Sequence, residues 1–274
     1  MQSINSYKKK NDKFYDNYFG NFDFDVYRND VGSYCTRKII INQIKQKTGK
    51  ILEIGTGVSS LLFDLQNFTC FGIDISESTI NFTKKLFEKE NKKAYFIVAD
   101  GEELPFKSNT FNVIVSSHTF EHIKNDEKVL KECARILAPN GELIIFVPGR
   151  KNGIATKQEF DKFGHYRYYN LKRFKYLEKN IYPLLKIKSI YYPHKIHNLI
   201  WNRFKKIFRW VNYPIKKWIL RDNKTYEKRI FYQKIILPCL AKMLDTLDKL
   251  FMHSEKNFLS IEFNVLVRFT KNKK

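Results

Sequence analysis

The sequence contains little cysteine, and what it has is scattered. Only four of its 274 residues are cysteine, namely Cys35, Cys70, Cys133 and Cys239. None of them has the paired spacing that a zinc site or a redox dithiol uses. A reduced, cytoplasmic protein is the simplest interpretation.

Long apolar runs are missing as well. The N-terminus, MQSINSYKKKNDK, is polar and has no apolar core of the kind found in signal peptides. No run approaches the roughly 18 apolar residues that a membrane-spanning helix needs. We therefore expect any contact with a membrane to be peripheral, at the inner face of an anionic membrane.

Acidic residues are scarce in the C-terminal half. The chain has 50 Lys and Arg against 28 Asp and Glu, a formal charge of +22. Residues 1–150 hold 21 basic and 19 acidic residues, which leaves 29 basic and 9 acidic residues for positions 151–274. A basic contact with a partner is therefore expected in the C-terminal half, and a simply solvated lysine-rich surface is the alternative.

Short apolar runs alternate with helical patterns through the first half of the chain. Strands are predicted at 51–54, 70–75, 94–100, 111–117 and 142–148, and a helix at 125–137. A sixth strand is predicted at about 187–193. At 259–268, mostly apolar positions alternate with polar ones, which predicts a half-buried antiparallel strand at or near a sheet edge. The fold class is therefore α/β, a Rossmann-like doubly wound sheet of seven mostly parallel strands with an antiparallel last strand.

Four parts are expected along the chain. They are an N-terminal cap (1–48), a cofactor-binding core (49–194), a basic helical insertion (195–257), and a final core strand with a basic tail (258–274).

A glycine-rich turn follows the first predicted strand, in the segment ILEIGTGVSS. Gly55 and Gly57 there let a ligand approach the backbone. Asp74, nineteen residues after Gly55, ends the second strand, where a carboxylate can accept hydrogen bonds from two ribose hydroxyls. Asp100 follows the third strand.

These features belong to a longer ordered set of motifs. GTG, GID, ADGEELPF, TFNVIVSSHTFEHI and LKECARILAPNGELIIFVP follow one another between residues 55 and 148. The set resembles class I S-adenosylmethionine-dependent methyltransferases, in the type 11 branch that includes ubiquinone and menaquinone biosynthesis enzymes. A hydride-transferring dehydrogenase shares the fold, but its chemistry does not require the segments ADGEELPF and RILAPNGEL.

The resemblance implies S-adenosyl-L-methionine as the cofactor. Glu53 would orient its amino group through the first turn, Asp74 would hold its ribose, and Asp100 with Gly101 would face its adenine. The backbone near Ser117 would close the methionine end. The full set of expected cofactor-binding residues is Glu53, Gly55, Thr56, Gly57, Asp74, Ile75, Asp100, Gly101 and Ser117.

Methyl transfer to a hydroxyl needs alignment of the acceptor and removal of its proton. His118, Glu121 and His122 are the candidates for this catalytic role, with His118 foremost, because they follow the fourth strand at the ligand-binding edge of the sheet. In ubiquinone-type O-methyltransferases, two acids and a histidine in this segment can hold a divalent metal. Here His118 replaces the first acid, so no residue is assigned as a metal ligand, and structural packing is the alternative role for His122.

A second cluster, FGHYRYYNLKRF at 163–174, resembles the Gly-His-x-Arg-x-Tyr stretch that opens the substrate region in many of these enzymes. It implies that His165 and Arg167 contact the acceptor. The alternative is that Tyr168 and Tyr169 are core aromatics and Arg167 is a surface charge.

A basic amphipathic helix is predicted within LIWNRFKKIFRWVNYPIKKWIL. It could form a lid, dock on a membrane or contact RNA. The favoured function is methyl transfer to a small-molecule, sugar or lipid-linked acceptor, with O-methylation preferred. The alternatives are an RNA methyltransferase that uses the basic C-terminal half, and a cofactor-binding protein without catalysis. RNA is disfavoured because SSHTFEH is not the Asn/Asp-Pro-Pro-aromatic motif of amino-group nucleic-acid methylases.

Overall fold

The computed structural model describes residues 31–58, 60–192, 239, 242, 246 and 262–272. Most of them belong to one compact unit, which contains Ile40–Tyr191 and Val265–Lys274. The first 30 residues of the expected cap lie outside the described residues. So do the basic amphipathic helix and, apart from three isolated positions, the expected insertion at 195–257.

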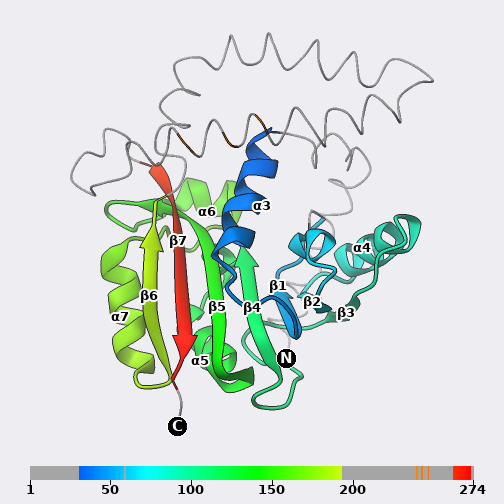
Figure 1. Ribbon diagram of the computed structural model, residues 1–274. Coiled ribbons are helices and arrows are strands. Elements are labelled where there is room, and N and C mark those ends of the chain that lie inside the picture. Colours follow the sequence, from blue (N-terminus) through cyan, green and yellow to red (C-terminus); the bar gives the residue numbers. More distant parts are fainter. Residues whose placement is uncertain are drawn as a thin grey trace. The chain divides into compact units, whose positions relative to one another are not determined.

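A seven-stranded sheet forms the centre of this unit (Figure 1). Its strand order is β3-β2-β1-β4-β5-β7-β6. The pairs β3/β2, β2/β1, β1/β4 and β4/β5 are parallel, whereas β7 runs antiparallel to β6. The predicted fold class is therefore confirmed. The strands are β1 (Lys50–Ile54), β2 (Thr69–Asp74), β3 (Tyr95–Val98), β4 (Phe111–Ser117), β5 (Leu137–Arg150), β6 (Leu185–Tyr191) and β7 (Glu262–Lys271).

Helices follow most of the strands and begin at polar capping residues. The side chains of Ser76, Asn125, Thr156 and Asn170 each accept a hydrogen bond from a backbone N–H in the first helical turn. These bonds satisfy donors that the helix itself leaves unpaired. The helical elements are α3 (Val31–Gln43), η1 (Leu61–Asp64), α4 (Glu77–Lys89), η2 (Phe120–His122), α5 (Asp126–Ile136), α6 (Lys157–Phe163) and α7 (Leu171–Ile181).

The last strand agrees with its prediction except at one position. Val265, Val267 and Phe269 are fully buried, whereas Asn264, Arg268 and Thr270 are partly exposed, as the alternation predicts. Leu266 is also fully buried, although it alternates with these buried positions. Strand β7 lies between β5 and β6, next to the edge strand β6 and antiparallel to it.

Pro139, Asn140 and Gly141 lie at an irregularity near the start of β5. Strand β5 already begins at Leu137, and its pairing with β4 shifts register between Phe111 and Val113. Asn140 has a φ of +60°. The three residues therefore form an irregularity within the strand rather than a separate turn before it.

No helix among the described residues is long and apolar enough to cross a membrane.

Candidate active site

The glycine turn lies directly after β1 and requires glycine at its first position. Gly55 has a φ of +73°, and its N–H donates to the carbonyl of Ile73 at 2.9 Å. A Cβ atom at Gly55 would overlap the side chain of Thr119. A Cβ at Gly57 would meet no atom within 4 Å. Gly55 therefore allows the turn to pack closely against Thr119, and Gly57 leaves open space beside the turn.

Asp74 lies beside this turn. Its Oδ2 accepts a hydrogen bond from the Gly57 N–H at 3.1 Å, and its Oδ1 accepts one from the Ser76 N–H at 3.0 Å. A carboxylate can accept about four hydrogen bonds, which is the property expected of a group that holds ribose hydroxyls. The structure brings these two predicted cofactor residues together, with Ile75 next to them in the chain at the end of β2.

Glu53 stabilises the chain that follows the turn. It is 2% exposed, and its carboxylate accepts hydrogen bonds from Ser60 Oγ at 2.5 Å and from the Leu61 N–H at 3.0 Å. Burial raises the pKa of Glu53 to about 7; the bonds from Ser60 and Leu61 oppose this rise, and the charge of Asp74 adds to it. Thr56, also buried, donates its N–H to the Ile73 carbonyl at 3.1 Å.

The remaining predicted cofactor residues follow β3 and β4. Asp100 accepts a hydrogen bond from the Glu102 N–H at 2.9 Å, and Gly101 lies near the side chains of the apolar core. Ser117 ends β4, and its carbonyl accepts a hydrogen bond from Thr119 Oγ1 at 3.2 Å. All the predicted cofactor residues therefore lie in or after four adjacent parallel strands, at the carboxyl edge where such sheets bind ligands. Their individual roles stay predictions.

His118 and Glu121 form a close pair after β4. His118 Nδ1 lies 3.3 Å from Glu121 Oε1, and His122 Nε2 lies 3.9 Å from the same oxygen. The His118 side chain is 49% exposed, whereas that of Glu121 is 1% exposed. Burial would raise the pKa of Glu121, but contact with His118 and the charge of His122 outweigh it and hold that pKa below its usual value. With Nδ1 facing a carboxylate, the other ring nitrogen of His118 is available to accept a proton.

The backbone of His118 is also unusual. Its φ is +53°, and its N–H donates to the Phe146 carbonyl at 2.8 Å. A left-handed conformation at a non-glycine residue is costly and tends to occur at functional sites.

The segment that follows α6 contacts Glu121 and His122. The Tyr166 N–H donates to the Glu121 carbonyl at 2.8 Å, and the His165 ring lies 4.9 Å from the His122 ring, centroid to centroid. Burial and the charge of His122 lower the pKa of His165. Two clusters that are more than 40 residues apart in the sequence are thus adjacent in space.

Arg167 is held by the backbone of the neighbouring loop. Its guanidinium donates to the carbonyls of Ile123 and Lys124, both at 2.5 Å, and lies 3.6 Å from Asp126 Oδ2. Its side chain is 18% exposed, so Arg167 is half-buried rather than a fully solvated charge. Contact with the acceptor stays a prediction for Arg167, and these bonds restrict the orientation of its side chain.

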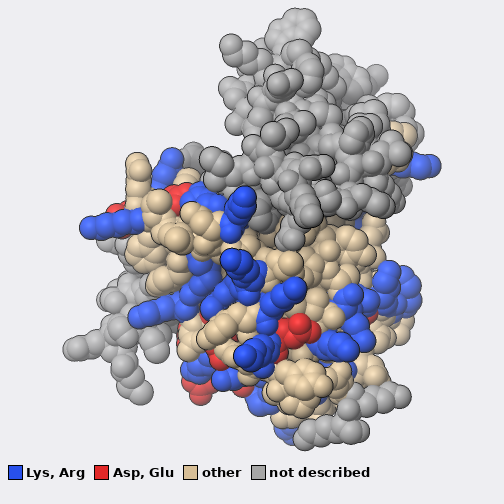
Figure 2. Space-filling view, turned by 90° about the vertical axis from the view of Figure 1, so that its left-hand side faces the viewer, with Lys and Arg blue, Asp and Glu red and all other residues tan. Residues whose placement is uncertain are grey.

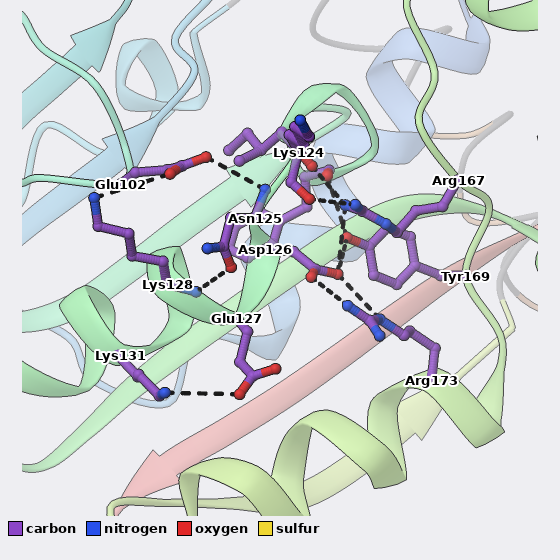
Figure 3. Close-up of polar contacts among 12 residues, drawn as sticks. Glu102, Lys124, Asn125, Asp126, Glu127, Lys128, Lys131, Arg167, Tyr169 and Arg173 are labelled. Atoms are coloured by element: carbon purple, nitrogen blue, oxygen red, sulfur yellow. Dashed lines mark hydrogen bonds and ion pairs between the residues drawn. The ribbon is translucent and has the colours of Figure 1, made fainter.

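Asp126 is the centre of this region, and the sequence did not reveal it (Figure 3). Its buried carboxylate accepts hydrogen bonds from Tyr169 Oη at 2.9 Å and from two nitrogens of Arg173. Tyr169 Oη also lies 3.2 Å from the Phe120 carbonyl. Tyr168 and Tyr169 are 6% and 0% exposed, so the prediction that they are core aromatics is confirmed. The sequence did not single out Asp126, because the favourable interaction with the helix dipole already explains an acidic residue in the first turn of a helix.

Comparison with known proteins agrees with this geometry. A family model described as "Methyltransferase domain" matches residues 52–145. The chain is 31% identical over 134 residues to the ubiquinone/menaquinone biosynthesis C-methyltransferase UbiE of Rickettsia typhi, which covers 45% of this chain and 53% of that protein. It is 25% identical over 129 residues to the sterol 4-C-methyltransferase strm-1 of Caenorhabditis elegans, covering 46% of this chain and 37% of that protein.

A solved structure shares the fold over a longer stretch. The phosphoethanolamine N-methyltransferase 2 of Haemonchus contortus, in complex with S-adenosyl-L-methionine, superposes with a TM-score of 0.57 at 18% identity, covering 89% of this chain and 53% of that one. The chain spans only about a third to a half of the length of these curated relatives. Within that span the motifs, the fold and the family model agree, and residues 52–145 of this chain form a methyltransferase domain of the class I S-adenosylmethionine-dependent family.

Proposed function

We propose that this chain transfers the methyl group of S-adenosylmethionine to a hydroxyl of a small organic acceptor. The observation that carries the proposal is the His118–Glu121 pair, 3.3 Å apart at the end of β4, on the edge of the sheet that also carries Gly57 and Asp74. The sulfonium supplies an activated methyl group, so the protein has to align the acceptor and remove its proton.

The acceptor oxygen would attack the methyl carbon as the bond from that carbon to sulfur breaks. The hydroxyl proton would pass to Nε2 of His118, while Glu121 stabilises the charge that forms on the imidazole. This geometry favours oxygen as the methylated atom, because a hydroxyl acceptor gains most from a nearby base. The named relatives are a sterol 4-C-methyltransferase and a ubiquinone/menaquinone biosynthesis C-methyltransferase, which supports an acceptor of lipid or small-metabolite type.

Contact with an anionic membrane is a further part of the proposal. On the side of the molecule where α7 and β6 lie, Lys and Arg side chains are much more prominent than Asp and Glu side chains on the described surface (Figure 2). Lys172, Lys175 and Lys179 of α7 are exposed there, together with Tyr176 and Tyr182. Lysines and tyrosines together suit the headgroup region of anionic lipids. Flotation with anionic and neutral vesicles tests this point, and equal recovery with both would contradict it.

Calorimetric titration with S-adenosylmethionine and S-adenosylhomocysteine tests the cofactor site. Asp74→Asn should weaken binding of both by on the order of 10–100-fold, because charge-assisted hydrogen bonds to the ribose are lost. Asp64→Asn, at an exposed acid of η1, is the matched control and should bind normally. Absence of binding to the unaltered protein would refute the proposal.

A screen of hydroxylated lipids, quinols and sugars, with products identified by mass, tests the chemistry. With an acceptor in hand, His118→Gln should lower kcat by roughly 100-fold or more while cofactor binding is unchanged. Total RNA is included in the screen, and methylation of RNA alone would favour the RNA methyltransferase instead.

A further inference from the structure

The two ends of the sheet differ in the side chains that they expose. Strand β6 lies at one end and β3 at the other (Figure 1). On β6, the exposed positions include Lys186 and Lys188. Lysines on an edge strand oppose its pairing with another chain, because they keep the edge solvated. Strand β3 has the sequence YFIV and no charged residue, so it lacks this protection.

One face of β3 is apolar and exposed. Tyr95 and Ile97 point to the same face of the strand and are 63% and 37% exposed. The connection from β3 to β4 contains no helix that could cover this face. The Tyr95 ring stacks on Phe71 of β2 with 5.0 Å between the ring centroids, which restricts its motion. An apolar side chain that is already ordered loses little conformational entropy when a partner covers it.

The backbone of β3 also offers hydrogen bonds at its outer edge. The Ala99 N–H donates to the Asp74 carbonyl of β2. Because successive residues of a strand direct their N–H and carbonyl groups to opposite sides, Ile97 also faces β2, whereas Phe96 and Val98 direct theirs outward. Among the strands that the structure describes, none lies beyond β3. The outer edge of β3 can therefore accept one more strand.

The charges on either side of β3 indicate which strand fits this edge. Basic residues come before the strand and acidic residues after it, namely Lys92 and Lys93, then Asp100, Glu102 and Glu103. In an antiparallel pair of two β3 strands, the basic end of each strand lies beside the acidic end of the other. A parallel pair would place like charges together, which opposes pairing. The charges therefore suit a second copy of this chain in the antiparallel orientation.

We propose that two copies of this chain dimerise by antiparallel pairing of their β3 strands about a two-fold axis at Phe96. A two-fold axis perpendicular to the sheet places one residue opposite its own copy, and Phe96 directs its N–H and carbonyl outward. In this register Tyr95 of each copy lies opposite Ile97 of the other, so the exposed apolar side chains cover one another. Both residues lie outside the candidate active site, so the proposal does not rest on the proposed function.

Sedimentation velocity of the full chain over a concentration series tests the dimer. Pairing of one short strand buries less surface than a standard interface of about 1,600 Å², so we expect a dimer that dissociates at about 1–100 µM. Ile97→Lys should weaken the dimer by roughly 10-fold or more, because it removes an apolar contact and places a charge in the interface. Thermal unfolding shows whether this variant folds, and Tyr95→Lys replaces it if it does not.

Tyr191→Lys is the matched control. Tyr191 lies on the other edge strand, β6, and is also 37% exposed, so the change adds the same charge at equal exposure. This variant should dimerise like the unaltered protein. A chain that stays monomeric throughout the series, or equal dimerisation by the Ile97→Lys and Tyr191→Lys variants, would overturn the proposal.

Disulfide formation tests the register. Two chains, each with Cys239→Ser to remove an exposed thiol, carry either Tyr95→Cys or Ile97→Cys. Opposite residues that do not exchange hydrogen bonds have Cα atoms about 4.5 Å apart, which a disulfide can span. Under oxidation, a mixture of the two chains should therefore form a covalent dimer, and neither chain alone should do so. Equal cross-linking by one chain alone would contradict the axis at Phe96 and overturn the proposal.

Discussion

The buried carboxylate of Glu53 makes the stability of this protein depend on pH in an unusual direction. An acid whose pKa rises on folding binds its proton more tightly in the folded chain than in the unfolded one. For Glu53 the pKa rises from 4.5 to about 7, and burial is the main cause. Between these two values the folded chain retains a proton that the unfolded chain releases. Stability therefore falls as the pH rises through this window, and the full penalty is present above pH 7.

The size of the penalty follows from the shift. A rise of about 2.5 pKa units corresponds to roughly 3 kcal/mol. Glu53→Gln removes the ionisation and keeps the side-chain oxygen that accepts the Leu61 N–H. The amide can also donate to Ser60 Oγ. The variant should therefore gain about 3 kcal/mol relative to the unaltered protein when the pH is raised from 4.5 to 8.

Urea unfolding at several pH values between 4.5 and 8 measures this gain. Glu88→Gln, at an exposed position of α4, is the control and should show no comparable pH-dependent gain. S-Adenosylmethionine provides a second readout, because its positive charge near the turn favours the ionised form of Glu53. Its affinity should rise with pH in the unaltered protein and stay flatter in Glu53→Gln. A stability difference between the two proteins that is constant across this pH range would refute the argument.

Three further substitutions test the contacts around the site. Gly55→Ala should lower Tm and weaken S-adenosylmethionine binding by roughly 10-fold or more, because a positive φ and overlap with Thr119 both oppose a side chain there; unchanged binding would contradict this. Tyr169→Phe should cost about 1–3 kcal/mol in denaturant unfolding, since its hydroxyl bonds the buried Asp126, and a loss under 0.5 kcal/mol would argue against that bond. Glu142→Gln should cost a similar amount, about 1–3 kcal/mol, by weakening the contact with Arg268 at 2.6 Å, and Arg268→Met should then add little to it.

The positions of the expected cofactor residues were predictable because the sheet itself arranges them. Parallel strands end at a common edge, so residues that follow β1, β2, β3 and β4 must lie near one another once the strand pattern is recognised. Gly57 and Asp74 illustrate this point, since their contact follows from two adjacent strands with no help from distant parts of the chain.

The acceptor half depends on contacts between segments that no strand pairing dictates. His165 and Arg167 were chosen by resemblance, but their neighbours were not, because the loop after β5 could have followed several paths. Asp126 is the clearest case, since its three partners lie more than 40 residues away in the chain. Burial of Leu266 in β7 was missed for a related reason. Alternation along one strand does not show which other parts of the chain will cover its second face.

The contacts that hold the acceptor half together also position the candidate base. Tyr169 and Arg167 bond to the backbone carbonyls of Phe120, Ile123 and Lys124, which flank or belong to η2, the element that carries Glu121. A change that loosens these bonds would move Glu121 relative to His118, because a single short turn connects them. Stability and proton transfer should therefore be coupled here. Arg167→Lys, which cannot reach both carbonyls at once, should lower kcat together with the free energy of unfolding, while the cofactor affinity set by β1 and β2 stays unchanged.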